Sequence, residues 1–152
     1  MNILDVLKKE AVLADLTAQS KKGIIEELVE PVAQIAGVTP DELVKVLMER
    51  ERLGSTGIGG GIGIPHGKMK DLESLVLGFG LSRKGVDFES IDNQPTHIFF
   101  ILVTPENSTG LHLKLLARIS KILKNESFKE NLMRAADRDE IYAIIKEEDN
   151  DF

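Results

Sequence analysis

The chain has 152 residues, of which 42% are hydrophobic and 29% are charged, values typical of a soluble globular protein. Its length is close to the commonest size of one domain, so we expect a single domain spanning residues 1–152. The 25 acidic and 19 basic side chains give a formal net charge of -6. Such a charge disfavours binding to nucleic acid phosphates and to anionic membrane surfaces.

The sequence contains no cysteine, which excludes disulfides, thiolate nucleophiles and zinc sites built on sulfur. Covalent chemistry must therefore use oxygen or nitrogen, and three histidines are present: His66, His97 and His112. No run approaches the roughly 18 apolar residues of a membrane helix, and the first residues lack the pattern of a signal peptide. We expect a cytoplasmic protein without membrane insertion.

The first 54 residues predict mainly helices. A short helix over Asn2–Leu7 and a short strand over Val12–Ala14 are weak signals. From Ser20 to Gly37 the apolar residues recur at helical spacing, and Pro31 within this run predicts one bent helix. A Thr-Pro-Asp-Glu sequence at residues 39–42 marks the start of a second helix, with Gly54 as its stop. Arg50 is then expected at a helix end that leads into a glycine-rich loop.

The middle of the chain predicts strands and its end predicts helices. The apolar runs Ser74–Leu81 and Thr96–Val103 suit strands buried on both faces, with turns at Lys84-Gly85 and Ile91–Pro95 between them. Three helices are expected afterwards, over about 110–123, from about Ser127 and from about Asp137. Helices, then strands, then helices predict an α/β layered domain with a mixed sheet.

The glycine-rich segment from Gly54 to Lys68 is the most informative part of the sequence. Six of the eleven residues from Gly57 to Gly67 are glycine, and clustered glycines allow backbone N–H groups to converge on an anion such as phosphate. Interspersed isoleucines argue against a flexible linker. Known nucleotide motifs do not fit, because Ile62 and Met69 occupy positions that a P-loop reserves for Gly and Ser or Thr. The backbone donors expected around phosphate are those of Ser55, Thr56, Gly57, Gly59, Gly61 and Gly67.

His66 lies between Pro65 and Gly67 at the end of this segment and is the candidate nucleophile. A neutral imidazole with one nitrogen fixed by a hydrogen bond can attack a phosphoryl group with the other nitrogen. His112 is expected in the first turn of a helix, where the dipole favours anions, and Arg50 offers a fork of donors to phosphoryl oxygens. His97 alternates within a strand and is more simply a structural residue.

The residues from Glu49 to Gly67 resemble the active-site signature of the fructose/mannitol type of enzyme IIA of the bacterial phosphoenolpyruvate-dependent phosphotransferase system. The motif Glu49-Arg50-Glu51, the pattern Gly54-Ser55-Thr56-Gly57-Ile58-Gly59 and the ending Ile64-Pro65-His66-Gly67 carry this resemblance. The segments Asp87–Pro95 and Leu111–Leu113 are similar to the nitrogen-regulatory branch of the family. The family fold is a three-layer α/β/α sandwich with a mixed sheet.

The resemblance implies a phosphoryl carrier without a cofactor. His66 would accept phosphate at Nε2 from the phosphohistidine carrier protein HPr or its nitrogen-branch relative, while His112 and Arg50 would bind and orient the phosphoryl oxygens. A regulatory protein that binds targets according to its phosphorylation state is favoured. The alternatives are a relay of phosphate to a cysteine of a separate IIB component for sugar uptake, and a module that binds an anion without covalent transfer.

The sequence departs from the family pattern at two places. Gly63 stands where the family commonly has alanine, and Thr96-His97 replaces a pair that often contains aspartate. A third imidazole could then lie near the sheet end, which leaves open a metal site made of His66, His97 and His112. No local spacing of ligands supports such a site, so we expect no metal.

Overall fold

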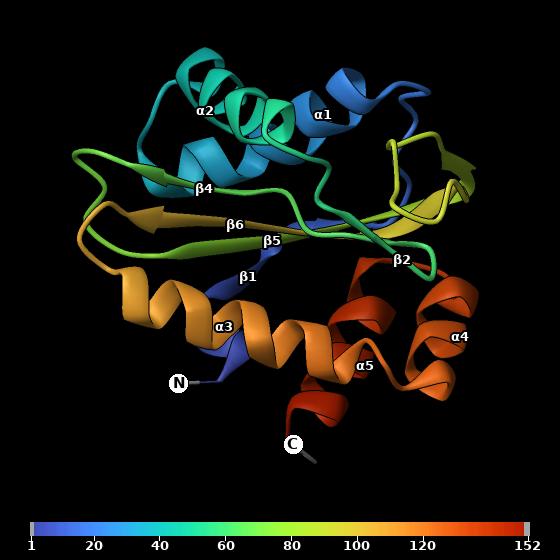
Figure 1. Ribbon diagram of the computed structural model, residues 1–152. Helices are drawn as coiled ribbons and strands as arrows, with labels where there is room; N and C mark the ends of the chain where they lie inside the picture. Colours follow the sequence, from blue (N-terminus) through green and yellow to red (C-terminus); the bar gives the residue numbers. More distant parts are fainter. Residues whose placement is uncertain (1, 151–152) are drawn as a thin grey trace.

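The computed structural model describes residues 2–150 and forms a sheet between two layers of helices (Figure 1). Two helices cover one face, α1 (Lys21–Ala36) and α2 (Pro40–Arg52). The opposite face is covered by α3 (Thr109–Ile122), α4 (Glu126–Arg134) and α5 (Arg138–Asn150). The predicted three-layer α/β/α sandwich is thus confirmed, with all three C-terminal helices close to their expected positions.

The sheet is mixed and contains six strands within the described residues. Its main path runs β1 (Leu7–Leu13), β5 (Val76–Val86), β6 (Thr96–Pro105), β3 (Ile62–Gly63) and β2 (Gly57–Gly59), and β4 (His66–Met69) pairs with another stretch of β6. The pairs β5–β6 and β2–β3 are antiparallel, whereas the pairs β1–β5, β3–β6 and β4–β6 are parallel. The glycine-rich segment therefore supplies three short strands, of which β3 and β4 pair with the central strand β6.

Each face of the sheet has its own hydrophobic core. Phe79 and Phe100 pack edge to face, with ring centroids 5.0 Å apart, in the core under α3 to α5. Phe88 and Phe99 make a similar contact at 5.1 Å in the core under α1 and α2. Gly78 lets α1 lie close to the sheet, because a Cβ atom there would come within 2.7 Å of Val32 in that helix.

The beginning of the chain differs from the prediction. Ile3–Asp5 form one turn of 3-10 helix, and β1 then starts at Leu7, so the expected helix over Asn2–Leu7 and the short strand over Val12–Ala14 were wrong in extent. The strand was hidden in the sequence by Lys8-Lys9-Glu10, which are exposed. β1 lies at the edge of the sheet, where charged side chains are common because they discourage pairing with other chains.

Helix α1 agrees with the prediction in its boundaries. The Ser20 hydroxyl accepts a hydrogen bond from the Gly23 N–H at 3.1 Å, and Gly37 ends the helix in the left-handed conformation with φ of 71°, as glycine does at many helix ends. Pro31 lies inside this uninterrupted helix. Within residues 2–150, no helix has both the length and the apolar character needed to cross a membrane.

The long strands β5 and β6 extend beyond the apolar runs that predicted them. β5 continues to Val86, and the expected turn at Lys84-Gly85 lies within it at an irregularity between Leu81 and Val86. β5 pairs with β6 again at Val86 and Thr96 after this irregularity, and β6 continues to Pro105, where it pairs with β4. The central pair β5–β6 consequently forms the frame on which β4 and its histidine are held.

Candidate functional site

His66 is the first residue of β4 and is held by the sheet and by its own neighbour. It pairs in register with Leu102 of β6, whose N–H donates to Pro65 O at 3.0 Å. Its ring atom Nδ1 lies 2.7 Å from Ile64 O. Because a carbonyl oxygen only accepts hydrogen bonds, Nδ1 carries the proton. The lone pair of the neutral ring is then at Nε2.

The surroundings of His66 favour the neutral ring. Burial lowers the pKa of His66 from its ordinary value of 6.5, and the positive charge of Arg50 lowers the pKa further. The bond to Ile64 O acts in the opposite direction, because it raises the pKa of the ring. Since the net pKa is lowered, His66 is uncharged at neutral pH and its Nε2 is available as a nucleophile.

His112 lies beside His66, with ring centroids 5.3 Å apart. It is buried in the first turn of α3, and its Nδ1 lies 2.7 Å from Thr104 Oγ1. Burial is the largest cause that lowers the pKa of His112 to about 4, and positive charge on His66 and Lys68 contributes to the same shift. His112 is therefore a neutral imidazole at pH 7. When the Thr104 hydroxyl donates to Nδ1, Nε2 of His112 holds the ring proton and is a hydrogen-bond donor.

Arg50 comes from the last turn of α2, and its Nη1 donates to Gly54 O at 2.9 Å. Arg50, His66 and His112 line one open cavity of about 620 Å³. The structure thus brings together the three side chains that the sequence singled out, from α2, β4 and α3. An arginine and two neutral imidazoles around a cavity are suited to hold an anion of the size of a phosphoryl group.

Several other residues line this cavity and were not identified as site residues from the sequence, among them Lys68, Leu53 and Leu113. Lys68 follows His66 by two positions on β4, and the side chains of Leu53 and Leu113 are 84% and 61% exposed. The alternation of side chains along a strand could have placed Lys68 beside His66. No sequence signal distinguished Leu53 and Leu113 from core leucines. Their exposure depends on where α2 ends and where α3 begins relative to the site.

The glycine-rich loop does not surround His66 in the way that the sequence suggested. The N–H groups of Thr56 and Gly57 donate to Glu51 and to Ser55 Oγ, and Ser55 Oγ itself donates to Phe88 O. Gly59 to Gly61 have positive φ and form the β2–β3 turn. Of the backbone set expected to cradle phosphate, namely Ser55, Thr56, Gly57, Gly59, Gly61 and Gly67, only Gly67 lines the His66 cavity.

Gly67 is required for packing. A Cβ atom at this position would come within 2.9 Å of Val46 Cγ1 in α2. The glycine after His66 therefore lets α2 lie directly against β4, which sets where Arg50 is presented.

Glu51 anchors the end of α2 to the loop that follows it. Its carboxylate is buried, accepts hydrogen bonds from the Thr56 N–H and hydroxyl, and lies 2.8 Å from Lys21 Nζ. Lys21 also contacts Glu89 at 3.3 Å. In the sequence, Glu51 was noted only as part of the Glu49-Arg50-Glu51 motif. The structure instead gives it a positioning role next to Arg50.

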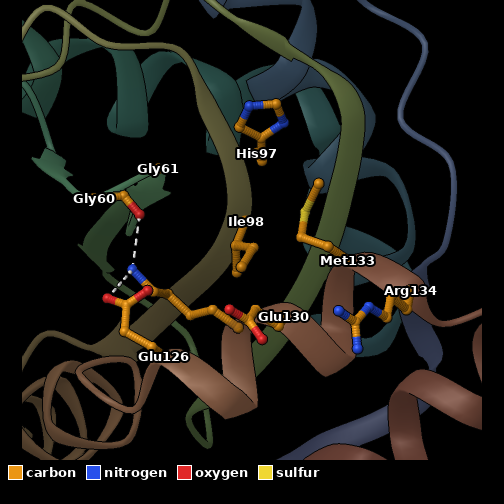
Figure 2. A pocket seen from close by; sticks show the side chains of 9 residues that line it. Gly60, Gly61, His97, Ile98, Glu126, Glu130, Met133 and Arg134 are labelled. Carbon is orange, nitrogen blue, oxygen red and sulfur yellow. Dashed lines mark hydrogen bonds and ion pairs between the residues drawn. The ribbon is translucent and has the colours of Figure 1, made fainter.

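His97 does not join His66 and His112. It lines a separate cavity of about 310 Å³ with Gly60, Gly61 and Ile98, on the α4 side of the sheet (Figure 2). Its Nδ1 bonds to Ser82 O at 2.9 Å. The metal site of three imidazoles that the sequence left open is therefore not formed, and residues 2–150 contain no cluster of three or more His, Asp or Glu side chains suited to a metal ion.

Comparison with known proteins identifies the family. The family model described as "Phosphoenolpyruvate-dependent sugar phosphotransferase system, EIIA 2" matches residues 5–148. The chain belongs to this family. A nitrogen regulatory protein of Bradyrhizobium diazoefficiens is 37% identical over 145 residues, which cover 95% of each chain. The crystal structure of the nitrogen regulatory protein IIA-Ntr from Neisseria meningitidis has a TM-score of 0.88 and 32% identity, and the match covers 93% of this chain and 97% of that one.

The family also includes sugar-specific members. The fructose-specific EIIABC component of Bacillus subtilis is 34% identical over 98% of this chain, which corresponds to 24% of that longer protein. EIIA 2 proteins thus occur both as proteins of this length and as parts of larger ones. Membership gives the chain a phosphoryl-carrier role in the phosphotransferase system, and the site geometry suggests how this role is carried out.

Proposed function

We propose that the chain carries a phosphoryl group on Nε2 of His66. The observation that carries this proposal is the bond from His66 Nδ1 to Ile64 O, because it leaves the lone pair of the neutral ring at Nε2. In the transfer, a bond forms between phosphorus and His66 Nε2 while the N–P bond of the donor breaks. The donor nitrogen keeps its electron pair, and the proton of His66 stays on Nδ1.

The phosphoryl donor is HPr or its nitrogen-branch relative, each carrying a phosphohistidine. Charge spreads over the three phosphoryl oxygens during such a transfer. Arg50 supplies a positive charge to these oxygens, and His112 supplies a neutral N–H donor. Because His112 is neutral, it binds and orients the phosphoryl group and does not compete as an acid.

The exposed leucines on the cavity rim form the seat for protein partners. Leu53 and Leu113 are 84% and 61% exposed and line the same cavity as His66. Exposed apolar side chains gathered at one site are typical of the core of a protein interface. A phosphoryl group adds about -1.5 to -2 charges between these leucines, which is sufficient to favour one partner and repel another.

Regulation through such partner contacts is the output that we propose, in the cytoplasm. Its support is that relatives of matching length are named nitrogen regulatory proteins. The second candidate is transfer to a cysteine of a IIB component for sugar uptake, and the similarity to a fructose-specific EIIABC component favours it. Both functions share the first step, the phosphorylation of His66.

The first test is intact-mass measurement after incubation with phosphoenolpyruvate, enzyme I and HPr. A covalent phosphoryl group adds about 80 Da, whereas a bound anion is lost. The His66→Ala variant should remain unlabelled, and His97→Ala, which alters a histidine in the other cavity, should be labelled like the parent. Labelling of His66→Ala would show that another residue is the acceptor.

The second test separates the two outputs. The purified phosphoprotein is mixed with IIB proteins of the fructose and mannitol type, and loss of label from the chain is followed with time. Retention of label over the time in which a sugar-specific IIA transfers it supports the regulatory output. Rapid transfer coupled to sugar phosphorylation supports the relay and counts against a purely regulatory protein.

A further inference from the structure

Lys68 is a positively charged residue in the His66 cavity, and it has no role in the phosphoryl transfer proposed above. It is two residues after His66 on β4, pairs in register with Thr104 of β6 and lines the same cavity as His66, His112 and Arg50. Its ammonium donates a hydrogen bond to Thr109 Oγ1 at 2.8 Å. Thr109 is the first residue of α3. The lysine is thus tethered to the helix start that also carries His112.

The charges that line the cavity make Lys68 important. Arg50 and Lys68 are the two cations among the lining residues, and Glu49 is the one anion. His112 adds no charge, because burial lowers its pKa to about 4. A phosphoryl group with nearly two negative charges would meet a lining of net charge +1 with Lys68 and of zero net charge without it.

The tether of Lys68 is weak enough to be exchanged. Its partner in the described structure is a neutral hydroxyl on an exposed residue, whereas an anionic phosphoryl oxygen adds the attraction between opposite charges to the hydrogen bond. Lys68 is itself exposed, and the flexible four-carbon stem of a lysine lets its ammonium move. An anion on the neighbouring His66 would therefore draw the ammonium away from Thr109.

We propose that Lys68 is a phosphoryl-binding residue, which exchanges its bond to Thr109 Oγ1 for a bond to a phosphoryl oxygen on His66. This inference rests on phosphorylation of His66. The exchange gives the phosphorylated state a second effect besides its charge, since Thr109 at the start of α3 loses its partner. Leu113 follows Thr109 by one helical turn, so the release occurs beside the exposed leucine that forms part of the partner seat.

The test measures the equilibrium between phosphorylated donor and phosphorylated chain, with three variants and a control. Lys68→Met keeps the length of the side chain and removes its charge, and we expect the equilibrium to shift toward the donor by about tenfold. Lys68→Arg should restore most of this shift. Lys70→Met makes the same charge change on an exposed residue that does not line the His66 cavity and should behave like the parent. Thr109→Val should shift the equilibrium several-fold toward the phosphorylated chain, because it removes a bond made only before transfer.

A phosphorus NMR titration supplies a readout that a merely structural role would not change. A nearby ammonium favours the dianion, so the second pKa of the phosphoryl group should rise in Lys68→Met and return in Lys68→Arg. An unchanged equilibrium and an unchanged titration in Lys68→Met would overturn the assignment, provided that the parent is labelled. An unchanged equilibrium in Thr109→Val would overturn the exchange. Failure of the parent itself to accept phosphate would refute the proposed function instead.

Discussion

Because His112 is buried as a neutral ring, we predict that acid lowers the free energy of unfolding of the protein. The pKa of His112 is about 4 in the folded chain, because of burial, against an ordinary value of 6.5. The folded state thus prefers the neutral ring, and the unfolded chain binds the proton first as pH falls. Stability from this residue is fully present above pH 6.5 and is lost progressively between pH 6.5 and pH 4. At pH 5 the loss is about 2 kcal/mol, from about 1.4 kcal/mol for each pH unit below 6.5.

The perturbation that isolates this effect is His112→Gln, which keeps a polar side chain and removes the titrating ring. The free energy of unfolding is measured by urea at pH 7.5 and pH 5.0, with circular dichroism as the signal because the chain has no tryptophan. The carboxylates titrate in both proteins, so their contribution cancels in the comparison. The parent should lose about 2 kcal/mol more than the variant between the two pH values. Equal losses would refute the burial argument for a neutral His112.

Other predictions concern packing and positioning. Gly78→Ala should lower the free energy of unfolding, measured with urea, by about 1–3 kcal/mol, because its Cβ would lie 2.7 Å from both Val32 and Ile101. The control Gly110→Ala, with no neighbouring atom within 4 Å of its Cβ, should not destabilise the protein in the same assay. Glu51→Ala should cost about 1–3 kcal/mol in the same assay, since it leaves the buried Thr56 N–H and hydroxyl without their acceptor, and an unchanged free energy of unfolding would contradict the anchoring role. Thr104→Val should slow phosphoryl transfer to the chain in a rapid-quench assay without loss of fold. An unchanged rate of transfer would show that the Thr104 hydroxyl does not orient His112.

The sequence predicted the layers of the fold and the chemistry of the site better than it predicted the path of the loop. Apolar periodicity located α1 and the central strands, because burial on one helix face or on both strand faces leaves a direct pattern. Only the end of β1 was predicted, since Lys8 to Glu10 are charged residues of the kind found at a sheet edge. The resemblance pointed to His66, His112 and Arg50, and the structure brings these three together in one cavity.

The loop and the additional site residues could not be predicted, for a physical reason. Glycine patterns show where the backbone adopts unusual conformations, but they do not show which partners its N–H groups find. Thr56 and Gly57 donate to Glu51 and Ser55, and these contacts depend on how α2 meets the loop in three dimensions. The same limit applies to Lys68. Its proposed role depends on the net charge of the residues that line the cavity, and these come from α2, β4 and α3.

The site joins stability and function through one property, the burial of neutral imidazoles. Burial lowers the pKa of both His66 and His112, and this is what keeps one ring nucleophilic and the other an uncharged donor at neutral pH. It follows that the positive charge for a phosphoryl group must come from side chains that remain charged, which in this cavity are Arg50 and Lys68. It also follows that acid should impair phosphoryl transfer and stability for the same reason. A His112→Gln variant, whose unfolding is less sensitive to acid than that of the parent, should therefore keep an acid-sensitive rate of transfer, because the nucleophile His66 still titrates.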